Sequence, residues 1–585
     1  MKRLSVLYTT LLLSVVIFLS ACAGSLQMTI LHINDSHSHI ENVSVSPVID
    51  GERTLMEAGG VARLSTIIED TGETETNVLF LHAGDAVQGT LYFTKYDGVP
   101  EIQWLNRMNL DAMVTGNHEY DRGSEALAYM VDMAEFPMLA GNVDVSNDPY
   151  LAGKLKPYTI VELQGGSVGI IGLVSPDTAE TSNPDETVIF YDITESAERL
   201  VQRLRSRGIN KILVLSHIGY ERDIALAEQV DHIDIIIGGH THTLLGTPDN
   251  LVPVVDGPYP TIVTGPSGKP VYVVTAWAHT RGIGRLDVTF DRKGNVTICD
   301  GYLTIPVGDT FYQRDSEGMY SAVDTDKRER ILQEINKSAM VTIVEEHPEI
   351  LEWIDPWRLG IEDLKGQVIG YNPEEILNVR IPGTRHGASG EILPYGSELA
   401  PLIADSMLWK TSQIGLNVDF AIQNAGGVRM GLTAGEITVG MVYELLPFEN
   451  TIYVLDITGR QIRELFESLM ERIESPDNDG AFPYTAALKY TADMNRPRGQ
   501  RIVHLMIMDA AGDWIPVDAE TTYRMVTNSY VASGRDGYTV LRDCDGYRYD
   551  TGFQDAEVFM EYIQAIESIG VMEPLITFFP VDTMK

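Results

Sequence analysis

The amino-acid sequence predicts an α/β fold of mixed α+β character, in which a layered domain precedes a second mixed α/β domain. Two observations predict it. From Leu26 to about Phe290, short and almost entirely apolar runs alternate with helix-like stretches, a pattern typical of strands that helices cover on both faces. The chain also has 585 residues, more than one hydrophobic core supports, so two or more domains are expected.

The elements of the first domain follow from the spacing of the apolar residues. Apolar, strand-like runs predict strands over Met28–Ile33, Val78–His82, Val168–Val174, Lys211–Ser216, Ile233–Ile237 and Val271–Ala276. Helical spacing predicts helices over Gly60–Asp70, Glu101–Asn109 and Glu195–Arg207. Gly284–Phe290, followed by Arg292-Lys293-Gly294, predicts a hairpin. We therefore expect the first domain to span residues 26–304.

The character of the sequence changes near residue 305, which predicts a connection between domains. Asp324–Met340 is charged and helix-forming, and Trp353 to Trp357 lie in a short segment of mixed character. We interpret residues 305–365 as a linker that includes a helix. We expect residues 366–585 to form a second domain, with helices such as Glu398–Leu408 and Gly459–Met470; the resemblance described below implies that it binds the substrate.

The N-terminus has the pattern of a targeting segment. Lys2 and Arg3 precede an apolar run from Leu4 to Leu19, which is too short for a stable membrane span. The run ends in Leu-Ser-Ala-Cys, which resembles a bacterial lipobox and implies cleavage before a lipid-modified Cys22. We expect residues 1–22 to be a lipoprotein signal peptide, and the mature protein to be exported and lipid-anchored in the bacterial cell envelope (periplasm or cell surface). An ordinary secretory signal is the alternative.

Composition and charge exclude several classes of partner. The formal net charge of −40 repels nucleic acid and anionic membrane surfaces, so no nucleic-acid partner is expected. The same field repels phosphorylated molecules, so a phosphate site needs bound metal or a few local arginines. Cys299 and Cys544 lie far apart in the sequence, and we expect small hydrophobic side chains there rather than a disulfide.

Polar clusters follow five of the strand-like runs in the first domain. They are Asn34-Asp35-Ser36-His37, Gly84-Asp85, Gly116-Asn117-His118-Glu119, Ser216-His217 and Gly238-Gly239-His240-Thr241-His242. Open α/β sheets bind ligands at the carboxyl ends of their strands, so the five clusters are expected to converge. Carboxylates, imidazoles and an amide oxygen without a thiolate match two divalent ions such as Mn²⁺, Zn²⁺, Co²⁺ or Fe²⁺. Two such ions, about 3.5–4 Å apart, hold a bridging hydroxide and clamp a phosphoryl group for in-line attack.

Taken in order, these motifs resemble the calcineurin-like metallophosphoesterase signature, and the strings HINDSHSHI and GNHEYD resemble the 5′-nucleotidase/UDP-sugar hydrolase family. The resemblance implies a four-layer α/β/β/α sandwich and hydrolysis of nucleoside phosphomonoesters. It implies that one metal is held by Asp35, His37, Asp85 and His242, and the other by Asp85, Asn117, His217 and His240. It also implies a catalytic dyad, in which His118 stabilises charge on the phosphoryl or leaving oxygen and Asp121 orients the ring.

Three segments of the second domain resemble the same family. Asn424-Ala425-Gly426-Gly427-Val428-Arg429 is similar to its NGGGIR segment, and Ala481-Phe482-Pro483 and Thr527–Tyr538 are similar to two others. The resemblance implies substrate contacts from Asn424 and Arg429, a nucleobase sandwiched by Phe482 and Tyr530, and a nucleoside contact from Asp536. The arginine that the family carries before a Leu-Gly-Asn-Leu helix start is missing. Either Arg385, in a Gly-rich loop, replaces it or one contact is absent.

Other functions remain open at this point. The same dinuclear centre would serve a 2′,3′-cyclic nucleotide phosphodiesterase, a nucleotide-sugar hydrolase or a broad phosphoesterase. A non-catalytic nucleotide-binding lipoprotein or an adhesin is disfavoured, because all the expected ligands and both dyad residues are present. The sequence leaves the metal identity, the preferred base and the oligomeric state undetermined. His39, His82, His232 and His279 lie near these segments, and we expect them to be satisfied core or loop residues.

Overall fold

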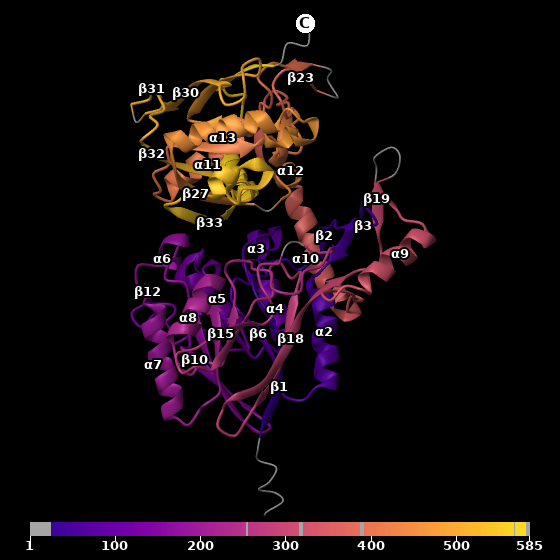
Figure 1. Cartoon of the computed structure of the whole chain (residues 1–585), viewed down its shortest axis with the longest axis vertical. Helices are drawn as coiled ribbons and strands as arrows, with labels where there is room; N and C mark the ends of the chain where they lie inside the picture. Colours follow the sequence, from indigo (N-terminus) through magenta and orange to yellow (C-terminus); the bar gives the residue numbers. More distant parts are fainter. Residues whose placement is uncertain are drawn as a thin grey trace, which may run out of the picture. The chain divides into compact units, whose positions relative to one another are not determined.

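The computed structural model describes residues 25–580, except 253–254, 315–319, 387–390, 449, 510 and 567. The expected signal peptide and Cys22 lie outside the described residues. The chain divides into two compact units, Met1–Leu359 (unit 1) and Gly360–Lys585 (unit 2), which are coloured from indigo to pink and from orange to yellow in Figure 1. Within the described residues, no helix combines the length and the apolar character needed to cross a bilayer.

Unit 1 is built on two β-sheets: four neighbouring parallel strands form one side of the larger sheet and the centre of the smaller one. The nine-stranded sheet has the order β2-β5-β18-β17-β1-β6-β7-β8, with β21 beside β18, and the six-stranded sheet has the order β10-β11-β13-β14-β16-β15. Parallel strands of the larger sheet are β1 (Leu26–Ile33), β6 (Val78–His82), β7 (Ala112–Val114) and β8 (Met138–Leu139). Those of the smaller sheet are β11 (Gly166–Val174), β13 (Ile212–His217), β14 (Ile235–Gly238) and β16 (Pro270–Val274). The remaining strands are β2 (Val43–Val45), β5 (Met56–Ala58), β10 (Tyr158–Leu163), β15 (Thr261–Thr264), β17 (Ile283–Phe290), β18 (Val296–Val307) and β21 (Val341–Ile343).

The two sheets of unit 1 pack against each other, and helices cover their outer faces. Strand β7 contacts β11 and β13 across the sheet–sheet interface, while α2 (Val61–Thr74) lies on β6 and β18. On the other sheet, α7 (Ile193–Ser206) packs on β11, and α8 (Tyr220–Gln229) packs on β14, β15 and β16. The helix–sheet–sheet–helix order confirms the predicted α/β/β/α sandwich.

Helix α7 shows how the local sequence produces this packing. The Asp192 side chain caps its first turn by accepting the backbone N–H of Glu195. Its apolar residues recur every three or four positions, which places them on one face, and that face is buried against the smaller sheet. The buried side chains of this face are Ala197, Leu200, Val201 and Leu204.

The predicted hairpin is confirmed, and the segment of mixed character that holds the tryptophans is helical. Strands β17 and β18 pair antiparallel around the turn at Asp291. The segment with Trp353 and Trp357 is one continuous helix, α10 (Pro348–Lys365), although Pro356 lies inside it. Proline removes one helical hydrogen bond, which weakens a helix that contains it. Here the two indole rings, one turn apart with centroids 6.2 Å from each other, and buried Ile354 stabilise the helix by packing.

Unit 2 contains a five-stranded and a four-stranded sheet with the orders β28-β25-β32-β27-β33 and β31-β30-β29-β34. The strands are β25 (Phe420–Asn424), β27 (Thr451–Thr458), β28 (Pro483–Ala486), β29 (Leu488–Asp493), β30 (Ile502–Met508), β31 (Trp514–Pro516), β32 (Thr522–Asn528), β33 (Arg548–Gln554) and β34 (Ile576–Phe579). Helix α11 (Ala400–Gln413) packs on β25, β28 and α16 (Asp555–Ile566). Helix α13 (Gly459–Arg472) begins with a capping box of Thr458 and Gln461.

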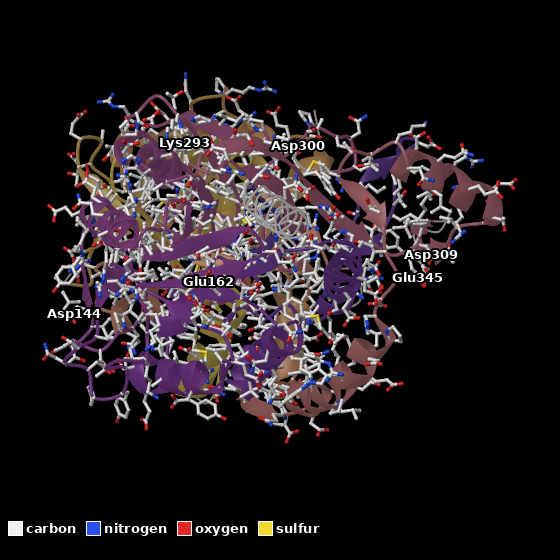
Figure 2. All side chains as sticks on the ribbon, turned by 90° about the horizontal axis from the view of Figure 1, so that it is seen from below. Asp144, Glu162, Lys293, Asp300, Asp309 and Glu345 are labelled. Atoms are coloured by element: carbon white, nitrogen blue, oxygen red, sulfur yellow. The ribbon has the colours of Figure 1, made fainter. Side chains whose placement is uncertain are left out.

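Acidic side chains of unit 1 lie both at its surface and in its interior. Figure 2 shows the side chains from below, with Asp144, Asp309 and Glu345 at the periphery of the unit. Of these, Asp309 and Glu345 are exposed to solvent and Asp144 is half-buried. Asp35, Asp85 and Glu119 are buried instead. Buried carboxylates require specific partners, so these three mark the centre described next.

Candidate functional site

Side chains that follow the ends of five strands meet at one place in unit 1. Strands β1, β6, β7, β13 and β14 are each followed by one of the polar clusters. One nitrogen or oxygen atom from each member of three overlapping groups lies within 4.8 Å of the others. The groups are Asp35, His37 and His242; His37, Asp85 and His118; and Asp85, His217 and His240. Since the groups share His37 and Asp85, they form one continuous cluster.

The first half of the cluster combines one loop after β1 with one after β14. The Nε2 atoms of His37 and His242 lie 2.9 Å apart. Oδ1 of Asp35 lies 3.5 Å from Nε2 of His242 and 3.8 Å from Nε2 of His37. Oδ2 of Asp85 lies 3.9 Å from the same nitrogen of His37. The predicted set of Asp35, His37, Asp85 and His242 is therefore assembled around a common point.

The second half shares Asp85 with the first. Oδ2 of Asp85 lies 2.9 Å from Nε2 of His217. The ring of His217 meets that of His240 at a centroid distance of 5.1 Å, and Nδ1 of His240 lies 3.0 Å from Oδ1 of Asn117. The Asp85 carboxylate thus stands between the two halves, where a bridging ligand is expected.

Hydrogen bonds determine which nitrogen of two histidines carries the lone pair. Nδ1 of His217 donates to the carbonyl of Ala83 (2.8 Å) and Nδ1 of His37 donates to the carbonyl of Gln88 (3.1 Å), because a carbonyl oxygen only accepts. In the neutral rings, the Nε2 lone pairs therefore face the cluster. Lone pairs of nitrogen and carboxylate oxygen at 2.9 Å repel each other unless positive charge lies between them. Backbone carbonyls behind the rings and lone pairs in front are the arrangement of a divalent-metal site, so the residues fit the implied ions.

The electrostatics of the side chains alone are consistent with that need for positive charge. Burial opposes the charged form of His217, but the carboxylates of Asp85 and Asp35 outweigh it and raise its pKa to about 9. Burial also opposes the charged form of Asp35, but the imidazoles of His242 and His217 outweigh it and lower its pKa to about 2. Against the effect of burial, the charged imidazole of His217 also holds the pKa of the Asp85 carboxyl well below its ordinary value, so Asp35 and Asp85 are both ionised at neutral pH.

Five of the seven predicted ligand residues have a left-handed backbone. The φ angles of Asp35, His37, Asp85, His240 and His242 are 48°, 47°, 54°, 80° and 49°. Residues other than glycine adopt this region at a cost of roughly 1–2 kcal/mol each. The backbone strain is concentrated where side chains from separate loops must turn toward one point.

Glycines beside the ligands permit their close approach. A Cβ atom on Gly84 (φ 89°) would lie 2.5 Å from Nδ1 of His217, and one on Gly116 would collide with the Asp85 carboxylate. A side chain at either position would displace a ligand. These two glycines therefore act through their lack of a Cβ atom.

Glu119, to which the sequence analysis gives no role, ties two ligand loops together. Its carboxylate accepts the backbone N–H groups of Asp85 (3.1 Å), Ala86 (2.8 Å) and Gly116 (2.6 Å). The first two belong to the loop after β6 and the third to the loop after β7. One buried side chain thus holds Asp85 and the Asn117–His118 segment in register. Its place in the Gly-Asn-His-Glu motif was the signal in the sequence.

Asn34 and His240 orient the Asp35 carboxylate. Nδ2 of Asn34 donates to Oδ2 of Asp35 (2.6 Å) and to the carbonyl of Trp277 (2.6 Å), while its Oδ1 accepts the N–H of Ala276 (2.6 Å). The backbone N–H of His240 donates to both oxygens of Asp35 at 3.0 Å. The loop after β16 is thereby fastened to the loop after β1.

His118 and Asp121, the predicted dyad, are in direct contact. Nδ1 of His118 lies 2.6 Å from Oδ2 of Asp121, and the hydroxyl of Ser182 donates to the other oxygen of Asp121 at 2.7 Å. Burial opposes the charged ring, but Asp121 and Asp85 outweigh it and raise the pKa of His118 to about 10. The ring is a cation at neutral pH, and its Nε2 remains available because Nδ1 is engaged. Ser182 is a further member that the sequence did not reveal, since it lies 61 residues away.

His279 and His39, which the sequence suggested were ordinary core or loop residues, lie beside the cluster. The ring of His279 contacts those of His242 and His37 at centroid distances of 5.3 and 5.6 Å, and it stacks on His39 at 4.2 Å. His82 is a satisfied structural residue: Nδ1 accepts the N–H of Gly84 (3.1 Å) and Nε2 donates to the hydroxyl of Ser36 (2.7 Å). His232 lines a different cavity of unit 1.

In unit 2, three of the predicted substrate residues form one hydrogen-bonded group. Nδ2 of Asn424 lies 3.2 Å from Oδ2 of Asp536, and the hydroxyl of Tyr530 donates to Oδ1 of Asp536 at 3.2 Å. Asn528 supports the group by donating to Oδ1 of Asn424 at 3.0 Å. The Tyr530 side chain is 43% exposed, so a face of its ring is accessible.

The aromatic residues of unit 2 are arranged differently from the prediction. Phe482 is fully buried and packs edge-on against Phe578 at 5.5 Å, so its ring offers no face to a nucleobase. The stacking role expected for it would require that ring to leave the core. Phe448 is 50% exposed instead, and the guanidinium of Arg429 lies over its ring at 5.4 Å. The apolar string Leu445-Leu446-Pro447-Phe448 resembles a core segment, which is why the sequence did not single it out.

Arg380, rather than Arg385, lies beside the Asn424–Arg429 loop of unit 2. Arg385 is in the exposed two-residue strand β23 (Thr384–Arg385). Nη1 of Arg380 donates to Oδ1 of Asp479 at 2.7 Å, and Gly480 packs so closely on Gly426 that a Cβ on Gly426 would lie 3.2 Å from its Cα. Arg380 therefore places a guanidinium beside the Asn424–Arg429 loop.

Comparison with known proteins gives two matching family models. The one described as "Calcineurin-like phosphoesterase" matches residues 28–244, and the one described as "5'-nucleotidase, C-terminal domain" matches residues 386–543. The first range contains all seven predicted metal ligands and both dyad residues. The second contains Asn424, Arg429, Phe448, Phe482, Tyr530 and Asp536.

Similar full-length proteins match along nearly the whole chain. A probable 5′-nucleotidase of Treponema pallidum is 34% identical over 557 residues, which cover 94% of this chain and 93% of the relative. An NAD 5′-nucleotidase of Haemophilus influenzae is 31% identical over 558 residues, which cover 92% and 90%. The solved structure of the Haemophilus influenzae NAD nucleotidase matches with a TM-score of 0.81 and 30% identity, and covers 95% of this chain and 99% of that one.

Proposed function

Because this chain belongs to the 5′-nucleotidase family and is a metallophosphoesterase-type hydrolase, we propose that it removes phosphate from nucleoside 5′-monophosphates with two divalent metal ions. The observation that carries the proposal is the convergence of ionised carboxylates and imidazole nitrogens on one point of unit 1. Such a cluster supplies ligands for hard or borderline cations and has no other evident use in a buried centre.

The proposed metal ligands divide into two sets that share Asp85. One ion would be held by Asp35, His37, Asp85 and His242, and the other by Asp85, Asn117, His217 and His240. Ions bound there would neutralise phosphoryl oxygens and lower the pKa of a water molecule. Oxygen and imidazole ligands without thiolate favour Mn²⁺, Zn²⁺, Co²⁺ or Fe²⁺.

We propose that His118 contacts the phosphoryl group and that Asp121 orients the His118 ring. Nδ1 of the ring is held by Asp121, so Nε2 is the atom that would donate a hydrogen bond to a phosphoryl or leaving oxygen. A protonated ring is favoured by the carboxylates around it. Ser182 would act as a positioning residue, because it fixes the second oxygen of Asp121.

Nucleoside recognition is assigned to unit 2. Asn424 and Asp536 offer amide and carboxylate groups that match the hydroxyls of a ribose. Arg429 offers a bidentate guanidinium for phosphate, and Arg380 is a better candidate than Arg385 for the missing arginine, because Arg380 lies at the same loop. Tyr530 and Phe448 are the half-exposed aromatic rings beside these groups, and their flat faces suit a nucleobase.

A second candidate reaction is cleavage within a dinucleotide or nucleotide sugar. The match to a solved NAD nucleotidase with a TM-score of 0.81 favours it. The same metal ligands would serve a phosphodiester or pyrophosphate, because the centre acts on phosphorus rather than on the leaving group. A 2′,3′-cyclic nucleotide is a further substrate of this kind.

One experiment separates these reactions. Metal-stripped protein is supplied with Mn²⁺, Zn²⁺ or Co²⁺, and phosphate release or product formation is measured with AMP, NAD, UDP-glucose, 2′,3′-cyclic AMP and p-nitrophenyl phosphate. Metal-dependent turnover that is greatest with AMP supports the nucleotidase assignment. Greater turnover of NAD or UDP-glucose replaces it with the second candidate, and no turnover with any metal contradicts both.

We also propose that the protein is exported and carries a lipid on Cys22. The basic start, the apolar run and the Leu-Ser-Ala-Cys ending of the N-terminal segment support this. Replacement of Cys22 by Ala should move the protein from the membrane fraction to the soluble fraction of a bacterial host. An unchanged membrane fraction would exclude the lipid anchor.

A further inference from the structure

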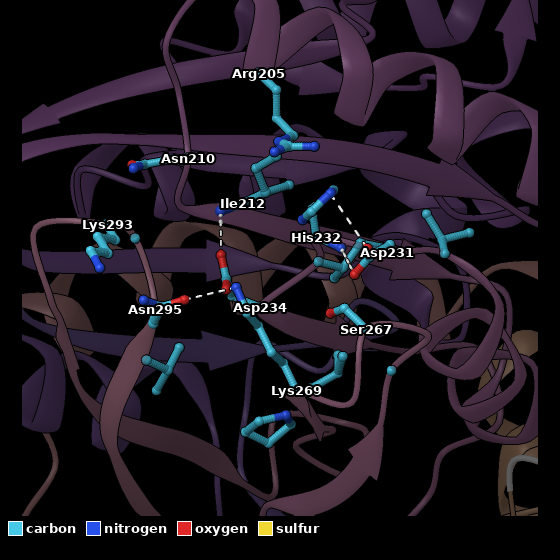
Figure 3. A pocket seen from close by; sticks show the side chains of 17 residues that line it. Arg205, Asn210, Ile212, Asp231, His232, Asp234, Ser267, Lys269, Lys293 and Asn295 are labelled. Atoms are coloured by element: carbon cyan, nitrogen blue, oxygen red, sulfur yellow. Dashed lines mark hydrogen bonds and ion pairs between the residues drawn. The ribbon is translucent and has the colours of Figure 1, made fainter.

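A cavity lies at the N-terminal ends of the parallel strands of the smaller sheet of unit 1, opposite the His217 and His240 side. Its lining lies near the starts of β13, β14 and β16, where Figure 3 labels Ile212 and Asp234. His217 is at the far end of β13, and His240 follows the far end of β14. Its volume is about 320 Å³. Pockets for small organic ligands begin at about this size. The cavity is therefore separate from the metal centre, although both use the same strands.

The floor of this cavity is apolar. It is formed by the buried residues Ile212, Val230, Ile233 and Val271, with Val296 beside them. Ile212 and Ile233 belong to the start of β13 and the approach to β14, so the floor is part of the rigid sheet. Such a surface gains free energy by covering a ring or another apolar body.

The rim is cationic. Arg205 comes from the end of α7, Lys269 from the β15–β16 turn and Lys293 from the β17–β18 turn, so three separate elements direct positive side chains at one opening. Among the described residues, none of the three forms an ion pair, and the Lys269 ammonium donates only to the amide oxygen of Asn295, at 2.7 Å. In a chain with a net charge of −40, three unpaired cations around one cavity form a local positive site.

The two acids of the cavity do not cancel this charge. The Asp231 carboxylate accepts the N–H of His232 at 2.9 Å, and Nε2 of the same ring lies 3.4 Å from its other oxygen. Oδ2 of Asp234 accepts the N–H of Ile212 at 2.9 Å. Burial raises the pKa of Asp234 to about 7, so this carboxyl carries only part of its charge at neutral pH. The three cations therefore outweigh the acids.

We propose that this cavity is a binding site for a small organic anion, with its phosphate or carboxylate group at Arg205, Lys269 and Lys293 and its apolar ring on the floor of Ile212, Ile233 and Val271. The site goes beyond the proposed hydrolysis and does not depend on it. A guanidinium and two ammonium groups match a doubly charged phosphate better than a single carboxylate. Ser267 and Asn210 add polar side chains at the rim.

Calorimetric titration of the metal-loaded full chain with phenylphosphonate tests this site. The probe carries a ring and a dianion joined by a C–P bond, which a phosphoesterase does not cleave. We expect two bound equivalents, one at each site. The triple variant Arg205→Gln, Lys269→Gln, Lys293→Gln should lose one equivalent or bind it at least tenfold more weakly. The matched variant Arg107→Gln, Lys154→Gln, Lys156→Gln removes three cations elsewhere in unit 1 and should keep both.

The variant Asp85→Ala separates this inference from the proposed function. It should lose the equivalent at the metal centre and keep the one at the cavity. Two equivalents in the triple variant, or none in Asp85→Ala, would overturn the inference whatever the enzyme hydrolyses. Benzoate and inorganic phosphate serve as comparison probes: weaker binding of both supports the combination of dianion and apolar floor. Equal affinity for inorganic phosphate would contradict the role of the floor.

Discussion

Nε2 of His217 lies 2.9 Å from Oδ2 of Asp85, while Nδ1 of the same ring donates to the carbonyl of Ala83. Two lone pairs therefore face each other unless a proton or a cation lies between them. The carboxylate also lies beside His37, in the other half of the centre. Asp85 is thus the residue whose loss would affect both proposed ions.

The first prediction concerns metal content. Asp85→Ala should lower bound metal from about two ions per chain to less than one, and activity should fall to background, because both ions share this carboxylate. Metal analysis by mass spectrometry after desalting measures it. Glu162→Ala, an exposed acid of the same unit, is the control and should keep both ions. Unchanged metal content in Asp85→Ala would remove Asp85 as the bridge.

The second prediction separates chemistry from metal binding. His118→Ala should lower kcat about 10²- to 10⁴-fold with metal content unchanged, because Nε2 of His118 acts on the phosphoryl group rather than as a ligand. Asp121→Asn should give a smaller loss, and Ser182→Ala a smaller loss again, in the order of their distance from the phosphoryl group. A normal kcat in His118→Ala would refute the assignment.

The third prediction distinguishes the exposed phenylalanine from the buried one. Phe448→Ala should raise KM for AMP about 5- to 100-fold and leave glycerol phosphate unaffected, because only AMP carries a base to stack. Phe482→Ala should lower the melting temperature of unit 2, since removal of a buried ring costs about 3–5 kcal/mol. A KM effect confined to Phe482→Ala, with normal stability, would return the stacking role to Phe482.

The fourth prediction concerns pH and stability. Burial raises the pKa of Glu101, on α4 (Val99–Arg107), from 4.5 to about 7. Between these values the folded protein binds this proton more tightly than the unfolded chain. The free energy of unfolding therefore falls as pH rises from 4.5 to about 7, and the loss is complete above the folded pKa.

Glu101→Gln removes that loss. The variant should resemble the wild type near pH 4.5 and be more stable at pH 8, by on the order of 1–3 kcal/mol. Thermal unfolding at both pH values measures the difference, with Glu162→Gln as an exposed control. An equal shift at both pH values would show that the carboxyl is not protonated in the folded protein.

The sequence predicts the clustering of these side chains because its signal is local. Each predicted ligand follows an apolar strand, and parallel strands end at the same edge of a sheet, so Asp35, Asp85 and His217 converge without knowledge of the loops. Ser182, and the bonds of Asn34 to Ala276 and Trp277, escape such reasoning. Their contacts depend on how distant loops fold back, and a lone serine or asparagine carries no periodicity.

Unit 2 is predicted less well because its features depend on tertiary packing. Phe448 and Phe482 both stand in apolar strings, and only the packing of the sheet decides which ring is exposed. The helix α10 is missed for the same reason, since the contacts of Trp353 and Trp357 outweigh an internal proline. The cationic cavity is also invisible in the sequence, because Arg205, Lys269 and Lys293 come from one helix end and two separate turns that only the fold brings together.

The left-handed backbone of the five predicted ligand residues has a consequence for the dynamics of their loops. Each of these residues has a backbone conformation that non-glycine residues rarely adopt, and neighbouring hydrogen bonds such as that from His240 N–H to Asp35 hold it there. The ions proposed to bind at this centre would add to that restraint. Removal of the metal with a chelator should therefore make these loops more mobile. Amide protons from Asp35 to Ser38 and from His240 to His242 should exchange faster with deuterium, while those within β1 and β6 stay protected. Bound metal would thus keep these loops in a backbone conformation that they leave more readily without it.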